Sequence, residues 1–272
     1  MLELVVSAPQ NLKDFTDNNY AQASFCLRTL LKDKEVKVNG KKVGENLWLN
    51  VGDVVRYYLT AKQAQKPAFH VVYQDENIVV IDKENGVNSE AVFADLSRRH
   101  GEGGRFIHRL DRNTQGLMVF ALNEETEKAL LDAFKTRAVG KVYHALCIGA
   151  LELPQATLTA YLKKDETKSL VKVFDQKVAG AEEIITEYKV LDYADGLSKA
   201  EIILHTGKTH QIRAHFAHIG NPVLGDMKYG NEEQNKLHGV ARQALVSKRL
   251  CLHLTGAWSY LNEKVFISQF EV

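Results

Sequence analysis

Apolar positions follow two different periods in the first 60 residues. Residues 23–32 (ASFCLRTLLK) place apolar side chains at helical spacing, whereas the apolar residues of 36–38 alternate as in a strand. The dipeptide Asn39-Gly40 favours a hairpin turn, and strand alternation returns at 54–57. The pattern predicts a helix followed by a small sheet.

A second series of strands begins near residue 69. Residues 69–87 (FHVVYQDENIVVIDKENGV) contain two β-rich runs that the polar turn 74–77 separates. Phe106 and Ile107 predict a strand that enters a polar loop over 108–115, and residues 117–122 (LMVFAL) resume as a strand. We expect this loop to lie at a sheet edge, where catalytic groups are commonly placed.

Later segments alternate between the two periods. Residues 124–136 (EETEKALLDAFKT) have helical periodicity with acids at the start, and 141–151 (KVYHALCIGAL) return to strand. Strand alternation places Tyr143 on the face opposite Val142 and His144, so its ring is predicted to face a cleft, although a lone strand tyrosine is usually a packing residue. An apolar strand then leads to a helix predicted from Thr209.

The chain divides into two predicted domains. Residues 1–62 form one unit, and a polar, proline-containing connection over 61–69 leads into the next apolar run. We therefore predict a small domain over 1–62 and a larger one over 63–272.

The charge of the whole chain is nearly balanced, and one short segment carries a basic excess. The 35 Lys and Arg nearly balance the 34 Asp and Glu, for a formal charge of +1, so nucleic-acid affinity requires a patch. Residues 28–42 contain six basic residues and two acidic ones. The basic residues are Arg28, Lys32, Lys34, Lys37, Lys41 and Lys42. Such a patch suits a phosphate backbone, but short charge runs are more often solvated surface. The V-x-V-N-G-K and V-G-D-V-V motifs here resemble the alpha-L RNA-binding domain, which favours RNA contact.

Cysteine usage and hydropathy indicate the setting. Cys26, Cys147 and Cys251 are far apart and never paired as C-x-x-C, which argues against a disulfide framework and a zinc site. No apolar run approaches the roughly 18 to 20 residues needed to cross a bilayer, and residues 1–15 lack the features of a signal peptide. These features predict a cytoplasmic protein with no membrane partner.

The loop segment IHRLDRNTQGL, residues 107–117, carries the first candidate chemistry. It places a single carboxylate, Asp111, between Arg109 and Arg112. Neighbouring positive charge favours the ionised form of an acid. Asp111 is therefore either a structural ion-pair residue or a nucleophile.

Three histidines near residue 210 raise the question of a metal. The spacing of His210, His215 and His218 puts only the last two on one helix face, without a His-Glu-x-x-His motif or a cysteine pair. We predict no metal site.

Several motifs together resemble those of the RluA family of pseudouridine synthases. The segments are YQDENIVVIDKENGV, IHRLDRNTQGL, KVYHAL and LHTGKTHQIRAHFAHIGNPVLGDMKYG, in this order across about 70–260. The resemblance implies an α+β fold: a catalytic domain with a mixed, largely antiparallel sheet and a central cleft, preceded by a small α/β RNA-binding domain. Gln115, Glu84, Lys208 and Asn221 depart from the family's usual residues, which bears on substrate choice more than on activity.

The same resemblance assigns roles to residues. Asp111 is implied as the catalytic aspartate, Tyr143 as the aromatic wall against the uracil, Arg213 as the partner of Asp111, and Arg109 as the residue that displaces the target base. The substrate-binding set is completed by His108, Lys208, His210 and Gln211.

The implied reaction converts uridine to pseudouridine. It requires an ionised carboxylate near C1′, as nucleophile or as base for a glycal intermediate, and needs no cofactor. The target base must be flipped out of a structured RNA, for which ribosomal RNA is favoured over transfer RNA, and the enzyme is expected to be a monomer. A non-catalytic RNA-binding protein is the alternative, and a glycoside hydrolase is disfavoured because only one acid sits in a convincing site.

Overall fold

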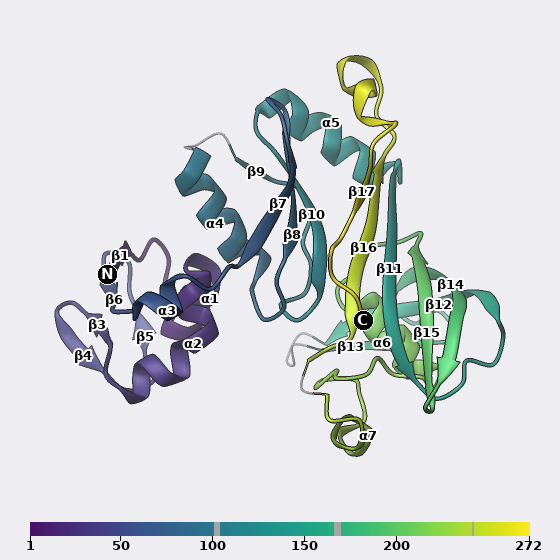
Figure 1. The fold of residues 1–272 in the computed structure, drawn as a ribbon, viewed down its shortest axis with the longest axis horizontal. Coiled ribbons are helices and arrows are strands. Elements are labelled where there is room, and N and C mark those ends of the chain that lie inside the picture. Colours follow the sequence, from purple (N-terminus) through teal and green to yellow (C-terminus); the bar gives the residue numbers. More distant parts are fainter. Residues whose placement is uncertain (101–103, 166–169, 241) are drawn as a thin grey trace.

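The computed structural model describes residues 1–100, 104–165, 170–240 and 242–272. Figure 1 shows an N-terminal region beside helix α4 and a second, larger region built around a long sheet. The N-terminal region contains β1 (Leu2–Val5), β2 (Gln10–Asn11), α1 (Leu12–Asn19), α2 (Ala21–Lys32), β3 (Val36–Val38), β4 (Lys41–Val43), β5 (Trp48–Leu49), β6 (Val54–Tyr57) and α3 (Ala61–Ala64).

The N-terminal region folds around a core of its own. Its four-stranded antiparallel sheet has the order β1-β6-β3-β4, and α1 and α2 pack against it through Leu12, Phe15 and Leu30, which are buried. The Asn11 side chain caps α1 by accepting a hydrogen bond from the backbone N–H of Asp14 at 2.9 Å. The helix and strands predicted from residues 23–57 are confirmed as α2, β3 and β6.

The Asn39-Gly40 turn joins β3 to β4 as expected. Both residues have positive φ, 50° and 81°, the backbone that asparagine and glycine tolerate best. The hairpin that carries Lys37, Lys41 and Lys42 lies, as Figure 1 shows, at the outer end of the N-terminal region. The connection predicted over 61–69 contains the short helix α3 and ends at Phe69, where β7 begins.

The second region is built on one eleven-stranded sheet. Its elements are β7 (Phe69–Gln74), β8 (Ile78–Lys83), α4 (Ser89–His100), β9 (Arg105–Phe106), β10 (Gln115–Ala121), α5 (Glu124–Lys135), β11 (Val139–Ile148), β12 (Gln155–Asp165), β13 (Leu170–Phe174), β14 (Glu182–Ala194), β15 (Leu197–Leu204), α6 (Gln211–His218), α7 (Glu232–Leu237), β16 (Leu245–Leu252), the 3-10 helix η2 (Gly256–Leu261) and β17 (Val265–Ile267).

The strand order is β13-β12-β14-β15-β11-β16-β10-β8-β7, with β17 on β16 and β9 on β10. The pairs of this sheet are antiparallel except β10 with β16, which is parallel. The predicted α+β fold with a mixed, largely antiparallel sheet is therefore confirmed.

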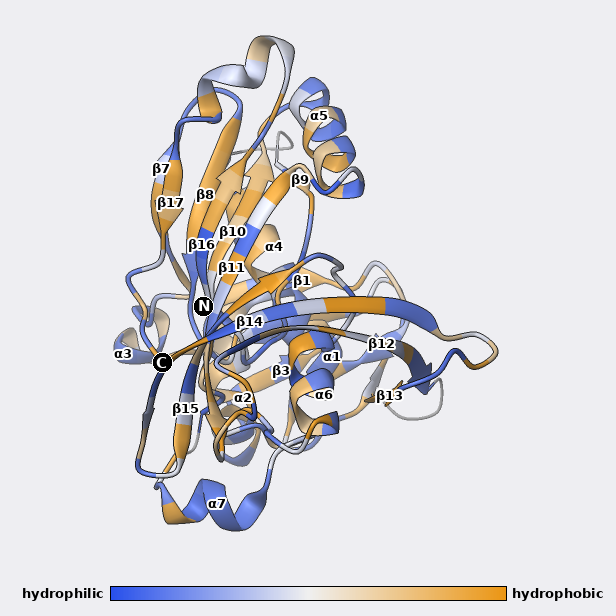
Figure 2. Ribbon diagram, turned by 90° about the vertical axis from the view of Figure 1, so that its right-hand side faces the viewer, coloured by the Kyte–Doolittle hydropathy of each residue, from blue (hydrophilic) through white to orange (hydrophobic). Residues whose placement is uncertain are grey.

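Strands β8 and β10 are buried on both faces. Val79 and Ile81 enter one core under α4, whereas Ile78 and Val80 enter a second core under α5. Figure 2 accordingly shows β8 and β10 as apolar along much of their length, with α5 polar on part of its surface. A strand with no solvated face has no polar alternation, which is why the run IVVI is continuous.

The loop that carries Asp111 does not lie at a sheet edge, contrary to the prediction. It leads into β10, which has β16 on one side and β8 on the other. Gly116 makes this junction possible: its φ is +111°, and a Cβ built there would lie 2.4 Å from the carbonyl oxygen of Ser247 in β16. A side chain at residue 116 would push β16 away from the loop.

None of the helices in the described ranges is long and apolar enough to cross a bilayer.

Candidate active site

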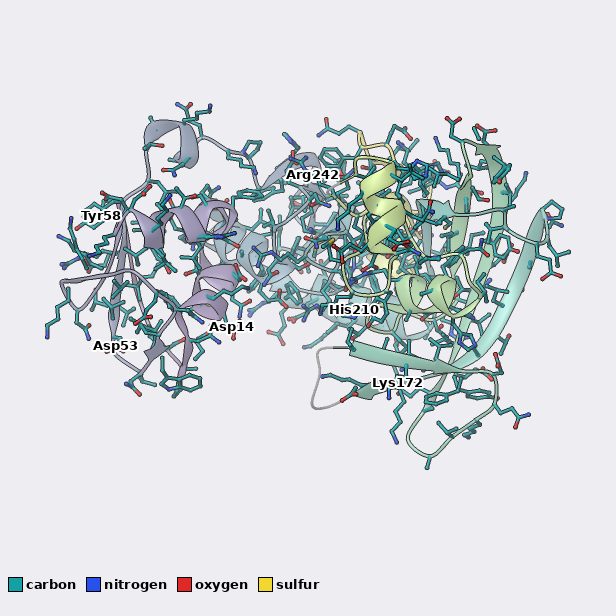
Figure 3. All side chains as sticks on the ribbon, turned by 90° about the horizontal axis from the view of Figure 1, so that it is seen from below. Asp14, Asp53, Tyr58, Lys172, His210 and Arg242 are labelled. Atoms are coloured by element: carbon teal, nitrogen blue, oxygen red, sulfur yellow. The ribbon has the colours of Figure 1, made fainter. Side chains whose placement is uncertain are left out.

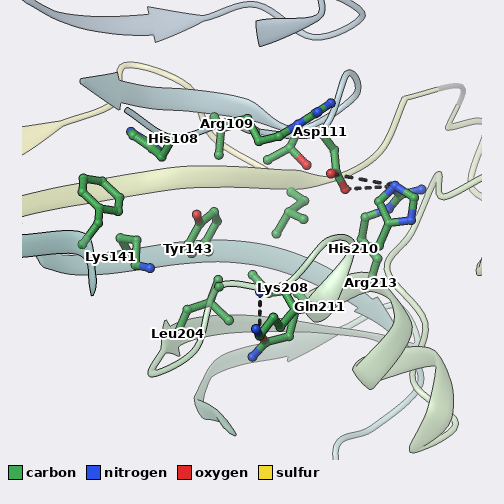
Figure 4. Close-up of a pocket in the computed structure, with 16 residues that line it drawn as sticks. His108, Arg109, Asp111, Lys141, Tyr143, Leu204, Lys208, His210, Gln211 and Arg213 are labelled. Atoms are coloured by element: carbon green, nitrogen blue, oxygen red, sulfur yellow. Dashed lines mark hydrogen bonds and ion pairs between the residues drawn. The ribbon is translucent and has the colours of Figure 1, made fainter. Parts of the chain in front are cut away.

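A pocket of about 270 Å³ opens between the Asp111 loop, strand β11 and the start of α6 (Figure 4). This volume lies just below the roughly 300–1,000 Å³ of typical small-molecule pockets. All the catalytic and substrate-binding residues predicted from the sequence line it: His108, Arg109, Asp111, Tyr143, Lys208, His210, Gln211 and Arg213.

Arg213 joins two carboxylates at the bottom of this site. Its Nη1 donates to Asp111 Oδ2 at 2.7 Å, while Nε and Nη2 donate to the two oxygens of Asp226 at 2.7 and 3.0 Å. The side chains of Arg213 and Asp226 are 6% and 1% exposed, whereas that of Asp111 is 20% exposed. Asp111 is therefore the member of the trio that a ligand can reach.

The pKa shifts follow from this arrangement. Burial alone would raise the pKa of Asp226, but the hydrogen bonds and charge of Arg213 outweigh it, and the pKa is lowered. Burial alone would lower the pKa of Arg213, but the hydrogen bonds that Arg213 donates to Asp226 and the charges of both aspartates outweigh it and raise that pKa. The guanidinium stays charged and fixed.

The arginines next to Asp111 in the sequence pair with other acids: Arg109 with Glu90 at 2.8 Å and Arg112 with Asp17. Arg213 contacts Asp111 through Nη1 alone, because its Nε and Nη2 bind Asp226. Residues adjacent in a loop point in different directions, so a partner 102 positions away, Arg213, supplies the charge.

Tyr143 lies in β11 with its ring in the pocket wall, as the alternation predicts (Figure 4). The register between β11 and β16 shifts at Val142/Tyr143, so Tyr143 faces Ser247 while Val142 faces Arg249. Burial raises the pKa of Tyr143 to about 12, the charge of Asp111 adds to this effect, and a hydrogen bond with Ser247 opposes it. The ring is a neutral phenol at neutral pH.

His108 and Gln211 line the pocket, but their polar groups form hydrogen bonds with other groups of the protein. His108 Nε2 accepts from the backbone N–H of Val119 at 3.1 Å, and burial, then the charge of Lys141, lowers the pKa of His108 to about 3. Gln211 accepts from the Lys208 N–H at 3.0 Å and donates to the carbonyl of Ile185 at 3.2 Å. Both residues shape the site.

His210 and Lys208 sit at the rim. His210 Nδ1 shares a hydrogen bond with the Tyr229 hydroxyl at 2.8 Å, and Nε2 is 3.9 Å from Asp111 Oδ1. The predicted helix starts two residues later than Thr209, because His210 has a left-handed backbone with φ 55°. Lys208 Nζ pairs with Glu182 at 2.6 Å.

Three polar residues around the pocket, two of them buried and one half-buried, were not predicted from the sequence. Asp226 lies in the motif LHTGKTHQIRAHFAHIGNPVLGDMKYG, and its place after the apolar run Val223–Leu224 and Gly225 was the available signal. Lys141 reaches the pocket two residues before Tyr143, and burial, then the charge of Arg137, lowers its pKa. Lys83 is completely buried beneath the loop, and burial lowers its pKa to about 7.

The predicted RNA-contacting residues of the N-terminal region do not join the pocket. The side chains of Arg28, Lys32, Lys34, Lys37, Lys41 and Lys42 are exposed or half-exposed on α2 and the β3–β4 hairpin. Figure 3 shows how the N-terminal region, with Asp53 and Tyr58, stands apart from the part that carries His210.

The histidines are also separated from one another. His215 is buried and bonds to Thr186 Oγ1 at 3.0 Å, whereas His218 pairs with Asp175 at 2.7 Å. Within the described ranges, no group of three His, Cys, Asp or Glu side chains is placed to hold a metal ion.

The sequence profile of the RNA pseudouridylate synthase family matches residues 63–218, more than half of the chain. The chain belongs to this family. It is an RNA pseudouridine synthase of the RluA type, an isomerase that acts on RNA.

Relatives extend the match beyond the profile. The ribosomal large subunit pseudouridine synthase C of Rickettsia bellii is 30% identical, over 75% of this chain and 76% of its own. The tRNA pseudouridine synthase C of Vibrio parahaemolyticus is 31% identical, over 67% and 81%. The solved structure of human RNA pseudouridylate synthase domain containing 1 has a TM-score of 0.60 and 26% identity, over 68% of this chain and 79% of its own.

Proposed function

We propose that Asp111 is the catalytic carboxylate and acts at C1′ of the target uridine. The observation that carries this proposal is the asymmetric binding of its two oxygens. Oδ2 accepts from the buried Arg213, while Oδ1 has His210 Nε2 at 3.9 Å, beyond hydrogen-bond reach. Arg213 therefore orients the carboxylate and leaves one oxygen free to approach the ribose.

Tyr143 and the apolar wall around it confine the uracil after its bond to the ribose breaks. In the reaction the C1′–N1 bond breaks, the base turns, C5 bonds to C1′, the C5 proton leaves, and N1 takes up a proton. Turning requires walls without a fixed hydrogen-bond pattern, and the ring of Tyr143 and the aliphatic side chain of Leu204 provide apolar surface. We assign both proton transfers to the Tyr143 hydroxyl, which gives its own proton to N1 and takes the C5 proton in return, so that the phenol is neutral before and after the step. Burial, which raises the pKa of Tyr143 to about 12, favours this neutral form.

Arg109 is the proposed residue that fills the place of the flipped base. Its side chain is 63% exposed at the rim of the pocket and pairs with the half-buried Glu90 at 2.8 Å. An arginine in such a position can enter a base stack with little rearrangement.

The RNA strand beside the target is proposed to follow a basic cleft. A second cavity, of about 440 Å³, shares Lys141, Leu204 and Lys208 with the pocket and continues along α5 and β11. Its basic lining residues are Lys135, Arg137, Lys141, His205, Lys208 and His253. Phosphates of a bound strand would be attracted there.

The N-terminal residues 1–62 are proposed as the alpha-L RNA-binding domain, with the basic hairpin as its phosphate-contacting surface.

Ribosomal RNA is the proposed substrate. It is supported by the relative named ribosomal large subunit pseudouridine synthase D of Buchnera aphidicola, 28% identical over 83% of this chain and 80% of its own. We further propose a monomer in the cytoplasm, since one chain supplies the described pocket lining and all three cysteines are free thiols.

Mapping pseudouridines in total RNA tests this proposal. Cells without the gene are complemented with the wild-type chain or with Asp111→Asn, and pseudouridines are located by carbodiimide-dependent reverse-transcription stops. We expect one or more ribosomal sites to disappear without the gene and to return only with the wild type. Restoration by Asp111→Asn would refute the role of the aspartate, and a lost site in transfer RNA would refute the substrate.

A further inference from the structure

Arg112 follows the catalytic aspartate directly but points into the N-terminal region. Its Nη1 forms an ion pair with Asp17 of α1, and Nη2 donates to Ser24 Oγ of α2 at 3.1 Å. Ser24 also donates to Asp17 Oδ1 at 2.5 Å. Asp17 and Ser24 are only 3% and 6% exposed, so this cluster is enclosed between the two regions.

The main chain of Arg112 is held as firmly as its side chain. Its carbonyl oxygen accepts from the Gly86 N–H at 2.9 Å and from Lys83 Nζ at 3.1 Å, and its Nε donates to the Gly86 carbonyl at 3.2 Å. The backbone and Nε of Arg112 are thus fixed on the larger region, and its Nη1 and Nη2 bind the N-terminal region. Any shift of α1 would be transmitted to the residue next to Asp111.

The contact between the regions is wider than this cluster. Ala21 of α2 is completely buried in the core under α4, and Phe25 packs against the same core. Asn88 donates to Asn18 at 3.2 Å, and Arg98 donates to the carbonyl of Asn19 at 3.1 Å. Figure 1 shows α1 and α2 beside α4, in agreement with these contacts. The N-terminal region is docked by an apolar and polar interface.

We propose that Asp17 is a positioning residue for the isomerisation. Through Arg112 it holds the loop that carries Asp111, so the N-terminal region contributes to the chemical rate in addition to any contact with RNA. This inference rests on the proposed role of Asp111. A displacement of about 1 Å in a reacting group can cost on the order of a hundredfold in rate, so a small relaxation of this loop is measurable.

Asp17→Asn in the full-length protein removes the charge and keeps the side-chain shape. Lys13, the other cation on Asp17, has a 53% exposed side chain and can return to solvent, whereas Arg112 loses its buried partner. We expect the single-turnover rate at saturating enzyme, on the RNA identified by mapping, to fall at least about tenfold. The dissociation constant for that RNA should stay within about twofold, because the exposed basic residues are unchanged.

Asp14→Asn is the matched control. It makes the same charge change on the same helix, but the Asp14 side chain is exposed and accepts only from Asn11 in the described contacts. Figure 3 places this residue on the N-terminal region. We expect a wild-type rate and affinity. Ser24→Ala, which removes the weaker contact and leaves the ion pair, should give a smaller loss of rate than Asp17→Asn and serves if that variant does not fold.

Hydrogen exchange provides a readout without activity. Peptides covering 107–116 should exchange faster in Asp17→Asn than in Asp14→Asn or the wild type. A wild-type rate, or a loss confined to RNA affinity, would overturn the inference, as would unchanged exchange of these peptides. If Asp111→Asn retains turnover, the proposed function fails instead, so the two failures are distinguishable.

Discussion

The active-site pocket and the basic hairpin both display cationic side chains, but they hold them differently. Arg213 is buried and contacts Asp111 and Asp226 through three nitrogens, all within 3.0 Å. In the described part of the chain, Lys37, Lys41 and Lys42 have no carboxylate within 4.0 Å, although Lys37 Nζ lies 5.1 Å from the ring of Tyr58. One set of charges has a fixed geometry, and the other is free to follow a ligand.

The difference separates two kinds of contribution. A fixed, buried charge orients a reacting group, so its geometry matters as much as its sign. Exposed charges on flexible stems act through their number and are screened by salt. Substitutions in the pocket should therefore change rate, and substitutions in the hairpin should change salt-dependent affinity.

The largest effect is expected for Asp111→Asn. The amide keeps the shape of the side chain but supplies no carboxylate, so the single-turnover rate should fall by about 10⁴-fold or more, by analogy with removal of other catalytic groups. RNA affinity should change little. Asp132→Asn, at an exposed position on α5, is the control and should be wild type. Measurable turnover by pure Asp111→Asn protein would contradict the assignment.

Tyr143→Phe should be next in size. It removes the hydroxyl and keeps the stacking ring, so the loss reports proton transfer, which is worth roughly 10² to 10⁴ in rate. Single-turnover assays measure this loss, and binding of the RNA should be retained. A rate within a few-fold of the wild type would leave Tyr143 with stacking alone and direct attention to His210 as the proton acceptor.

Arg213→Lys should cost on the order of a hundredfold in single-turnover rate. Lysine keeps the charge but cannot bind Asp226 with two nitrogens while it also holds Asp111. Arg249→Lys makes the same change where the side chain is 44% exposed and its partner Glu201 is 3.9 Å away, and it should have no effect. A wild-type rate combined with weaker RNA binding would mean that Arg213 contacts RNA.

The smallest effect on rate is expected when Lys37, Lys41 and Lys42 are all changed to glutamine. The single-turnover rate at saturating enzyme should be unchanged. The slope of log affinity against log salt should fall by about one for each lysine that contacts a phosphate. The same change at the exposed lysines Lys128, Lys189 and Lys236 is the charge-matched control. Equal slopes for both triple variants would show that the hairpin is only a solvated surface.

Most local elements, and the residues proposed for the reaction, could be predicted from the amino-acid sequence alone. Periodicity predicted β7, β8, α5 and β11 because burial imposes a period of two or 3.6 on neighbouring residues. The motifs likewise brought Asp111, Tyr143 and Arg213 to attention before any geometry was available. These features depend on short stretches of chain, which is why they could be found in the sequence.

The tertiary structure decided which charges meet. No local pattern relates Arg112 to Asp17, or Arg213 to Asp226, because these pairs form only after α1 docks beside α4 and after α6 packs beneath the sheet. The same holds for the Asp111 loop, which the parallel pairing of β10 with β16 moves from the predicted edge to the middle of the sheet. The direction of a loop side chain does not follow from a periodic pattern in the sequence. Its contacts therefore depend on which helices and strands pack around the loop.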